Sequence, residues 1–207
     1  MTSRPVEGAR TVPGSVPAPE LVARTVSAAD TRALARSLAS VVLVGDVVLL
    51  IGDLGAGKTT FAQGFAAGLG VQGPVTSPTF TLVRQHPCRL DRRQWGAAPA
   101  GSAPVGTLLH ADVYRLDHLQ EVVDLGLGEL VEDGAVAIVE WGDMAGPVLG
   151  DHALHVRIEP DRYVPEDRYV PEGDWRTVTI GGPGAVDRWA DLEEAVGPWT
   201  ARLGPGS

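Results

Sequence analysis

Residues 52–59 read Gly-Asp-Leu-Gly-Ala-Gly-Lys-Thr and match G-x-x-x-x-G-K-[ST], the pattern of a phosphate-binding loop. Its glycines let the backbone curl so that successive N–H groups point at phosphate oxygens, and a following helix adds the positive end of its dipole. In such a loop Lys58 reaches the β- and γ-phosphates of a nucleotide, and the Thr59 hydroxyl ligates Mg²⁺. Lys58 is the single lysine among 17 basic residues, which favours a dedicated role for its compact ammonium group.

Two carboxylates stand directly after apolar runs, where they could serve the same nucleotide. Asp112 follows residues 108–109 with His110 between them, and Glu140 follows the run 135–139. Each run predicts a buried strand, and ligands of an open α/β sheet bind beyond the carboxyl ends of the strands. We therefore expect Asp112 and Glu140 to hold Mg²⁺ and to position the attacking water; the alternative is that each is a solvated strand end. We interpret His110 as a packed residue that orients Asp112.

Hydroxyl side chains surround Pro78 in segment 75–83, shortly after the helix expected beyond the phosphate-binding loop. A switch loop that senses the γ-phosphate would lie at this position. Ser77 and Thr79 are therefore candidate switch residues. An ordinary Ser/Thr/Pro turn is the alternative.

Apolar patterns place the loop inside a strand-loop-helix unit. The unbroken apolar run 47–51 predicts a strand buried on both faces, as in a parallel sheet. Residues 58–69 repeat large apolar side chains at four-residue spacing and predict a helix. Similar patterns predict two more helices and an antiparallel hairpin: 28–40, 118–132, and 153–158 with 177–180. Together they predict an α/β, P-loop NTPase-type three-layer fold with a mainly parallel central sheet and a C-terminal antiparallel extension.

Composition divides the chain into one domain with appendages. Residues 1–20, rich in Pro, Gly and Ala, predict a disordered N-terminal tail, and 21–180 form the predicted P-loop domain. Residues 181–207 are interpreted as a C-terminal tail with one short amphipathic segment. Inside the domain we expect an insertion and an extended turn that holds the duplicated hexapeptide DRYVPE: 84–106 and 161–172. The basic cluster in the insertion is interpreted as solvated: Arg84, Arg89, Arg92 and Arg93.

The charge of the chain bounds its partners. Its 207 residues include 17 basic and 26 acidic side chains, a net charge of −9, with −13 in residues 112–207 alone. Since phosphate neutralisation dominates nucleic-acid affinity, tight independent binding to RNA or DNA is disfavoured, and an RNA role would act through a partner. The sequence shows neither a membrane span nor a secretory signal, and its one cysteine cannot form an internal disulfide. We expect a cytoplasmic protein without membrane contact.

Four motifs in order resemble the TsaE (YjeE) family: GDLGAGKTT at 52–60, VTSPTFTLV at 75–83, HADVYRL at 110–116 and VEW at 139–141. The resemblance covers residues 26–158 and is specific, because P-loop proteins in general share only the first motif. The family is the bacterial ATPase component of the machinery that makes threonylcarbamoyladenosine next to the anticodon of tRNAs.

The resemblance implies a hydrolase that binds ATP and Mg²⁺ and acts with the proteins TsaB and TsaD, which carry the transferase chemistry and most of the tRNA contact. It implies a switch-loop role for Thr79, a Walker-B-like part for Asp112, and an approach of Glu140 to Mg²⁺ or the catalytic water. The nucleotide-binding residues expected are Gly52, Asp53, Gly55, Ala56, Gly57, Lys58, Thr59 and Thr60. The catalytic residues expected are Glu140, Asp112 and Lys58, and the metal ligands are Thr59, Glu140 and Asp112.

Two other functions remain open from the sequence. One is a small-molecule kinase on the same loop, with the arginine-rich segment as a lid. The other is a nucleotide-binding regulatory module without significant turnover. A GTPase is disfavoured, because guanine is usually read by an Asn-Lys-x-Asp loop and the chain contains no Asn.

Overall fold

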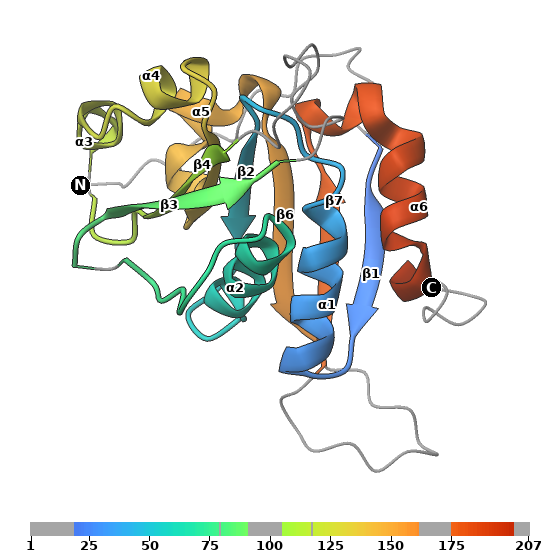
Figure 1. Cartoon of the computed structure of the whole chain (residues 1–207). Helices are drawn as coiled ribbons and strands as arrows, with labels where there is room; N and C mark the ends of the chain where they lie inside the picture. Colours follow the sequence, from blue (N-terminus) through green and yellow to red (C-terminus); the bar gives the residue numbers. More distant parts are fainter. Residues whose placement is uncertain (1–18, 79, 91–104, 117, 162–174, 201–207) are drawn as a thin grey trace, which may run out of the picture.

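The computed structural model describes residues 19–78, 80–90, 105–116, 118–161 and 175–200. They form seven strands in one sheet with helices on both faces (Figure 1). The strands are β1 Leu21–Thr25, β2 Val47–Ile51, β3 Val83–Arg89, β4 Val105–Asp112, β5 Val136–Glu140, β6 Leu154–Pro160 and β7 Arg176–Gly181.

The sheet is parallel only at its centre. Its order is β1-β7-β6-β2-β5-β4-β3, and the neighbours among β6, β2, β5 and β4 pair in parallel. Strand β3 pairs antiparallel with β4, β7 with β6, and β1 with β7. The expected mainly parallel sheet is thus a mixed sheet with antiparallel strands at both edges. The predicted hairpin is present as β6 and β7, and its first strand also extends the parallel core.

The helices are α1 Ala28–Leu38, α2 Lys58–Gly68, α3 Leu119–Asp124, α4 Leu127–Glu132, α5 Gly142–Leu149 and α6 Trp189–Thr200, with 3-10 turns at Gly150–His152 and Pro183–Arg188. Side chains of β2 alternate between two cores. Val48 and Leu50 pack with residues of α1, α2 and α6, whereas Val47 and Leu49 pack with residues of α3, α4 and α5. The described residues therefore form three layers, as the sequence predicts, with α1 and α2 side by side on one face (Figure 1).

Helix α1 begins as its sequence predicts. The Ser27 hydroxyl accepts a hydrogen bond from Asp30 N–H at 3.1 Å, and Asp30 Oδ2 accepts one from Val26 N–H at 3.0 Å. The first bond satisfies an amide group that the first helical turn leaves unpaired, and the second ties the residue before the cap to the helix.

The region 118–132 is two helices where one was expected. Gly126 adopts a φ of 65° and caps the start of α4, which breaks the predicted helix. A left-handed conformation at this position favours glycine, whose missing Cβ removes the steric penalty.

Both ends of the expected insertion 84–106 belong to the sheet, because residues up to Arg89 lie in β3 and β4 begins at Val105. Arg84 and Arg89 are therefore strand residues, while Arg92 and Arg93 lie outside the described residues. The first 18 residues and most of the duplicated hexapeptide also lie outside them.

The expected C-terminal tail includes helix α6, which packs on the core. Leu192 and Val196 are fully buried, and Trp199 Nε1 donates to Asp30 Oδ1 at 2.9 Å. Among the described helices, none combines the length and apolar character that crossing a membrane requires.

Candidate nucleotide-binding site

The predicted site residues meet at the carboxyl ends of three neighbouring parallel strands. The phosphate-binding loop follows β2, while Asp112 and Glu140 are the last residues of β4 and β5. These two carboxylate residues are direct partners in the strand register. The alternation of side chains places Asp112 and Glu140 on the same sheet face as Leu108 and Ile138, the face that α2 covers. The sheet thus brings both carboxylates to the start of α2.

The loop is curled by glycines in conformations that other residues rarely adopt. The φ angles are 148° at Gly52, 78° at Gly55 and 112° at Gly57. A Cβ built on Gly52 would lie 2.3 Å from the Ile158 carbonyl oxygen, so this position also requires close backbone contact. Successive amides in such a loop form a concave anion site at the start of a helix.

Lys58 begins α2 with its side chain folded over the loop. Its ammonium donates to the carbonyl oxygens of Gly52 and Asp53 at 2.7 and 2.8 Å, and lies 3.7 Å from the centre of the Trp141 ring. Burial lowers the pKa of Lys58, while the carboxylates of Glu140, Asp112, Asp143 and Asp53 act in the opposite direction. The result is a buried cation beside the loop.

Glu140 is held from two sides. Thr59 Oγ1 donates to Glu140 Oε2 at 2.8 Å, and the imidazole Nε2 of His110 lies 2.9 Å from Glu140 Oε1. Glu140 and His110 are both buried. His110 therefore orients Glu140, and the interpretation that it orients Asp112 is wrong. In the strand register His110 faces Ile138, two residues before Glu140 and on the same sheet face.

Asp112 is tied to the predicted switch segment. Ser77 Oγ donates to Asp112 Oδ2 at 2.6 Å, and the Tyr114 N–H donates to Oδ1 at 3.2 Å. The Asp112 N–H also donates to the Leu82 carbonyl at 2.9 Å. Thr79, the other candidate switch residue, lies outside the described residues.

A pocket of about 420 Å³ joins these groups. It is lined by Leu54, Gly55, Gly57, Lys58, Thr59, Thr60, Ser77, Asp112, Tyr114, Glu140 and Trp141. Of the other expected nucleotide-binding residues, Gly52 and Asp53 line a neighbouring pocket along β6, and the Ala56 side chain is buried. The geometry thus gathers most of the residues that the sequence singles out.

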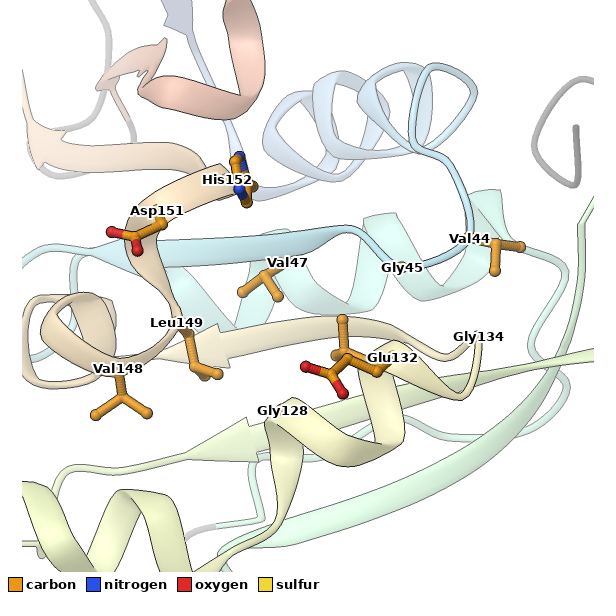
Figure 2. A pocket seen from close by; sticks show the side chains of 11 residues that line it. Val44, Gly45, Val47, Gly128, Glu132, Gly134, Val148, Leu149, Asp151 and His152 are labelled. Atoms are coloured by element: carbon orange, nitrogen blue, oxygen red, sulfur yellow. The ribbon is translucent and has the colours of Figure 1, made fainter.

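A third pocket, of about 390 Å³, lies at the opposite end of the parallel strands, where β2 begins. Figure 2 shows the aliphatic side chains of Val47, Val148 and Leu149 in it, with Glu132 and Asp151 among them. None of the predicted site residues lines it. The convergent polar groups that nucleotide binding needs are instead at the phosphate-binding loop.

The oxygen atoms around Glu140 suit Mg²⁺. This ion prefers oxygen ligands and usually keeps several waters while binding one or two carboxylates and substrate phosphates. Thr59 Oγ1, Glu140 Oε2 and the Asp112 carboxylate supply such oxygens at the pocket. Within the described residues no group of three or more His, Cys, Asp or Glu side chains gathers as a metal cage. The hydroxyl and carboxylate oxygens at the pocket are the ligand types that could hold such an ion.

Two non-glycine residues with positive φ flank the site, Leu82 at 61° and Trp141 at 63°. Such backbone costs energy and concentrates at functional sites. At Trp141 it turns the chain directly after Glu140, where the indole packs against Lys58 and stacks on Tyr114 at 4.6 Å between ring centres. The contact with Lys58 places the indole of Trp141 over the ammonium group at the pocket.

Arg176 is a residue that the sequence analysis missed. Its Nε donates to the Ala56 carbonyl oxygen at 2.7 Å, from a strand 120 positions further along the chain. The residues next to Arg176 in the sequence give no signal for a contact with a residue so far away along the chain.

The family follows from comparison with known proteins. A family model described as threonylcarbamoyl adenosine biosynthesis protein TsaE matches residues 25–169, more than half of the chain. The chain belongs to the TsaE family. This TsaE-family chain is 40% identical over 166 residues to the tRNA threonylcarbamoyladenosine biosynthesis protein TsaE of Streptomyces coelicolor, covering 80% of this chain and 97% of the relative.

Two further matches agree with that membership. The Mycobacterium tuberculosis protein of the same description is 43% identical over 136 residues, covering 63% of this chain and 73% of the relative. The crystal structure of YdiB from Bacillus subtilis matches with a TM-score of 0.62 and 31% identity, covering 89% of this chain and 98% of that one. The resemblance carried by the four motifs is thus confirmed at the level of the family.

Proposed function

We propose that this TsaE-family chain is a Mg²⁺-dependent ATP hydrolase that acts with TsaB and TsaD in making threonylcarbamoyladenosine in tRNA. The observation that carries the proposal is the convergence of Lys58, Thr59 and Glu140 at the carboxyl ends of β2 and β5. A loop of this form is a P-loop, and a carboxylate beside its Lys and Thr is what nucleotide hydrolysis requires. Family membership supports the tRNA pathway.

In this proposal each of the residues gathered at the pocket has a task. Backbone N–H groups of the loop and the Lys58 ammonium bind the phosphates. To do so, the ammonium exchanges its hydrogen bonds to the carbonyls of Gly52 and Asp53 for bonds to phosphate oxygens. Glu140, held by His110, orients the attacking water. Asp112 couples the site to the switch segment through Ser77. Trp141 covers the ammonium and excludes water from one side.

Thr59, Glu140 and Asp112 are the residues that would hold the metal ion. When bound, Mg²⁺ neutralises charge that develops on the β- and γ-phosphate oxygens. The Thr59 hydroxyl now donates to Glu140, so both groups already face the same point of the pocket. A hydroxyl and a carboxylate aimed at one point are suited to share one metal ion.

The nucleotide and RNA preferences follow from charge and composition. We expect ATP to bind in preference to GTP, because the chain lacks the Asn of a guanine-reading loop. We expect tRNA to contact the assembly mainly through TsaB and TsaD, since the net charge of −9 opposes phosphate contact by this chain. Steep salt dependence and submicromolar affinity of the isolated chain for tRNA would contradict that division.

The testing experiment is an ATPase assay with the isolated chain, with TsaB and TsaD added, and with tRNA added. Low turnover alone and a large increase with the partners support the proposal, and Lys58→Ala should remove nucleotide binding or hydrolysis in each case. Wild-type ATP affinity and turnover in the Lys58→Ala variant would refute the assignment of the site. Equal turnover with and without partners would refute the dependence on the assembly.

A further inference from the structure

Arg176 connects the antiparallel extension of the sheet to the phosphate-binding loop. It is the first residue of β7 and pairs with Pro160, the last residue of β6. Because β6 runs parallel to β2, Arg176 lies at the same end of the strands as the loop. Its Nε donates to Ala56 O at 2.7 Å, and its Nη1 donates to Trp175 O at 2.8 Å. Because the guanidinium is planar and rigid, two carbonyl contacts fix its orientation.

The residue before Arg176 is fixed as well. Trp175 is only 8% exposed, and the guanidinium of Arg24 lies 5.8 Å from the centre of its ring. Arg24 also forms an ion pair with Asp161, with 2.5 Å between Nε and Oδ2. Arg24 of β1 thus contacts the residues that directly follow β6 and precede β7, next to the point from which Arg176 reaches the loop.

The contact with Ala56 controls an amide that faces the nucleotide pocket. In a planar trans peptide the C=O of one residue and the N–H of the next point to opposite sides. Holding Ala56 O against Arg176 therefore directs the Gly57 N–H away from Arg176, and Gly57 lines the pocket together with Lys58 and Thr59. Within the described residues, no acceptor receives that N–H.

A glycine follows this peptide bond. Gly57 has a φ of 112° and no Cβ, so no side chain on Gly57 opposes a rotation of the peptide between Ala56 and Gly57. A rotated peptide would present a carbonyl oxygen to the phosphates in place of an N–H donor. A hydrogen bond to Ala56 O from outside the loop opposes this rotation.

We propose that Arg176 is a positioning residue for nucleotide binding, which locks the Ala56–Gly57 peptide with its N–H toward the phosphates. The inference rests on the proposed function, because it assumes that the loop binds a nucleotide. Arg176 acts through a hydrogen bond from Nε and not through its charge. It contributes to binding of the nucleotide and leaves the hydrolytic groups around Glu140 unchanged.

Three substitutions separate the hydrogen bond from the charge. Nε2 of glutamine stands at the same distance along the side chain as Nε of arginine, so Arg176→Gln keeps the donor and removes the charge. Arg176→Met keeps the length and removes both. Arg176→Lys keeps the charge but has a methylene at the ε position, and its donor lies one bond further out.

The experiment measures binding of a non-hydrolysable ATP analogue with Mg²⁺ to the full chain by titration calorimetry, with Lys58→Ala as the loss-of-binding control. Arg176→Met should weaken binding about tenfold, the effect of losing one hydrogen bond, and Arg176→Gln should stay within about threefold of the wild type. With the partners present, the Met variant should raise KM for ATP more than it lowers kcat.

Wild-type affinity in Arg176→Met would overturn the proposal, and so would a Lys variant that binds more tightly than the Gln variant. Melting temperatures without nucleotide show whether each variant folds; if Arg176→Met is unfolded, the comparison of Gln with Lys decides. If the wild type binds no nucleotide, or binds as Lys58→Ala does, the proposed function fails. If the wild type binds the analogue, Lys58→Ala does not, and Arg176→Met binds it as tightly as the wild type does, the proposed function stands and this inference fails.

Discussion

The Thr59 hydroxyl donates to the Glu140 carboxylate at 2.8 Å, although the two residues stand 81 positions apart in the chain. The other carboxylate oxygen lies 2.9 Å from the His110 imidazole. Helix α2, strand β5 and strand β4 each contribute one member of this row. Since a buried carboxylate with a partner on each oxygen has one preferred orientation, Glu140 is preorganised.

Replacing Glu140 with Gln should therefore separate catalysis from binding. The amide keeps the size of the side chain and removes its negative charge, so turnover with TsaB and TsaD should fall about 100-fold or more while nucleotide affinity falls less. Single-turnover hydrolysis and calorimetric titration measure the two effects. Asp112→Asn should also lower turnover. Unchanged hydrolysis by the Glu140→Gln variant in the partner complex would show that another group serves the water.

The close approach of α1 and α2, which fixes the helix behind the loop, depends on Gly64. A Cβ built there would lie 2.3 Å from the Arg32 carbonyl oxygen and 2.5 Å from its Cα. Gly64→Ala should force the helices apart and lower the free energy of unfolding by about 2 kcal/mol. Gly128→Ala is the matched control: it lies in α4 with no atom within 4 Å of the added Cβ. Equal stabilities of the two variants in urea unfolding would contradict this prediction.

The centre of the molecule could be predicted from the sequence because its signals are local. The run 47–51 is apolar at every position, as a strand covered on both faces must be, and it forms β2. The glycines and Lys58 stand at the fixed spacing of a phosphate-binding loop, so the sequence alone predicts the conformation of this loop. The meeting of the carboxylates at the ends of β4 and β5 could be predicted because ligands of a parallel sheet bind beyond the carboxyl ends of its strands.

The edges of the sheet could not be predicted in the same way. Strand β3 reads Val-Arg-Gln-His-Pro-Cys-Arg, with polar residues and a proline, and among the described strands it pairs with β4 alone. Edge strands tolerate such residues because one side of their backbone is unpaired. The contact of Arg176 with Ala56 depends on β7 returning beside the loop, and His110 meets Glu140 through strand register. Neither relationship has a signal in the local sequence.

Cys88 should report on the opening of that edge strand. It is 1% exposed, and burial raises its pKa to about 11. With this pKa only about one thiol in a thousand is ionised near pH 8. Since the thiolate is the reactive form, the folded protein should react slowly. Iodoacetamide should therefore leave the folded protein unmodified over hours and label it fully in urea, as mass spectrometry can show for a chain with a single cysteine. Rapid labelling of the folded protein would mean that β3 opens readily.

His155 links the stability of the sheet to pH. Burial lowers its pKa from 6.5, the Arg157 guanidinium lowers it further, and the Glu20 carboxylate opposes them. Its Nε2 is buried and has no hydrogen-bond partner among the described residues. A proton on this ring would therefore be poorly solvated in the folded protein.

The sign of the effect follows from proton binding. Below pH 6.5 the unfolded chain binds a proton at His155 that the folded protein resists, so the free energy of unfolding should fall as the pH drops below this value. His86, whose pKa is also lowered by burial, acts in the same direction.

Urea unfolding at about pH 7.5 and about pH 5.5 should show a smaller loss of unfolding free energy for His155→Gln than for the wild type. His152→Gln, which removes an exposed histidine, is the matched control. Equal losses in the wild type and His155→Gln would show that the His155 ring accepts its proton as readily in the folded protein as in the unfolded chain.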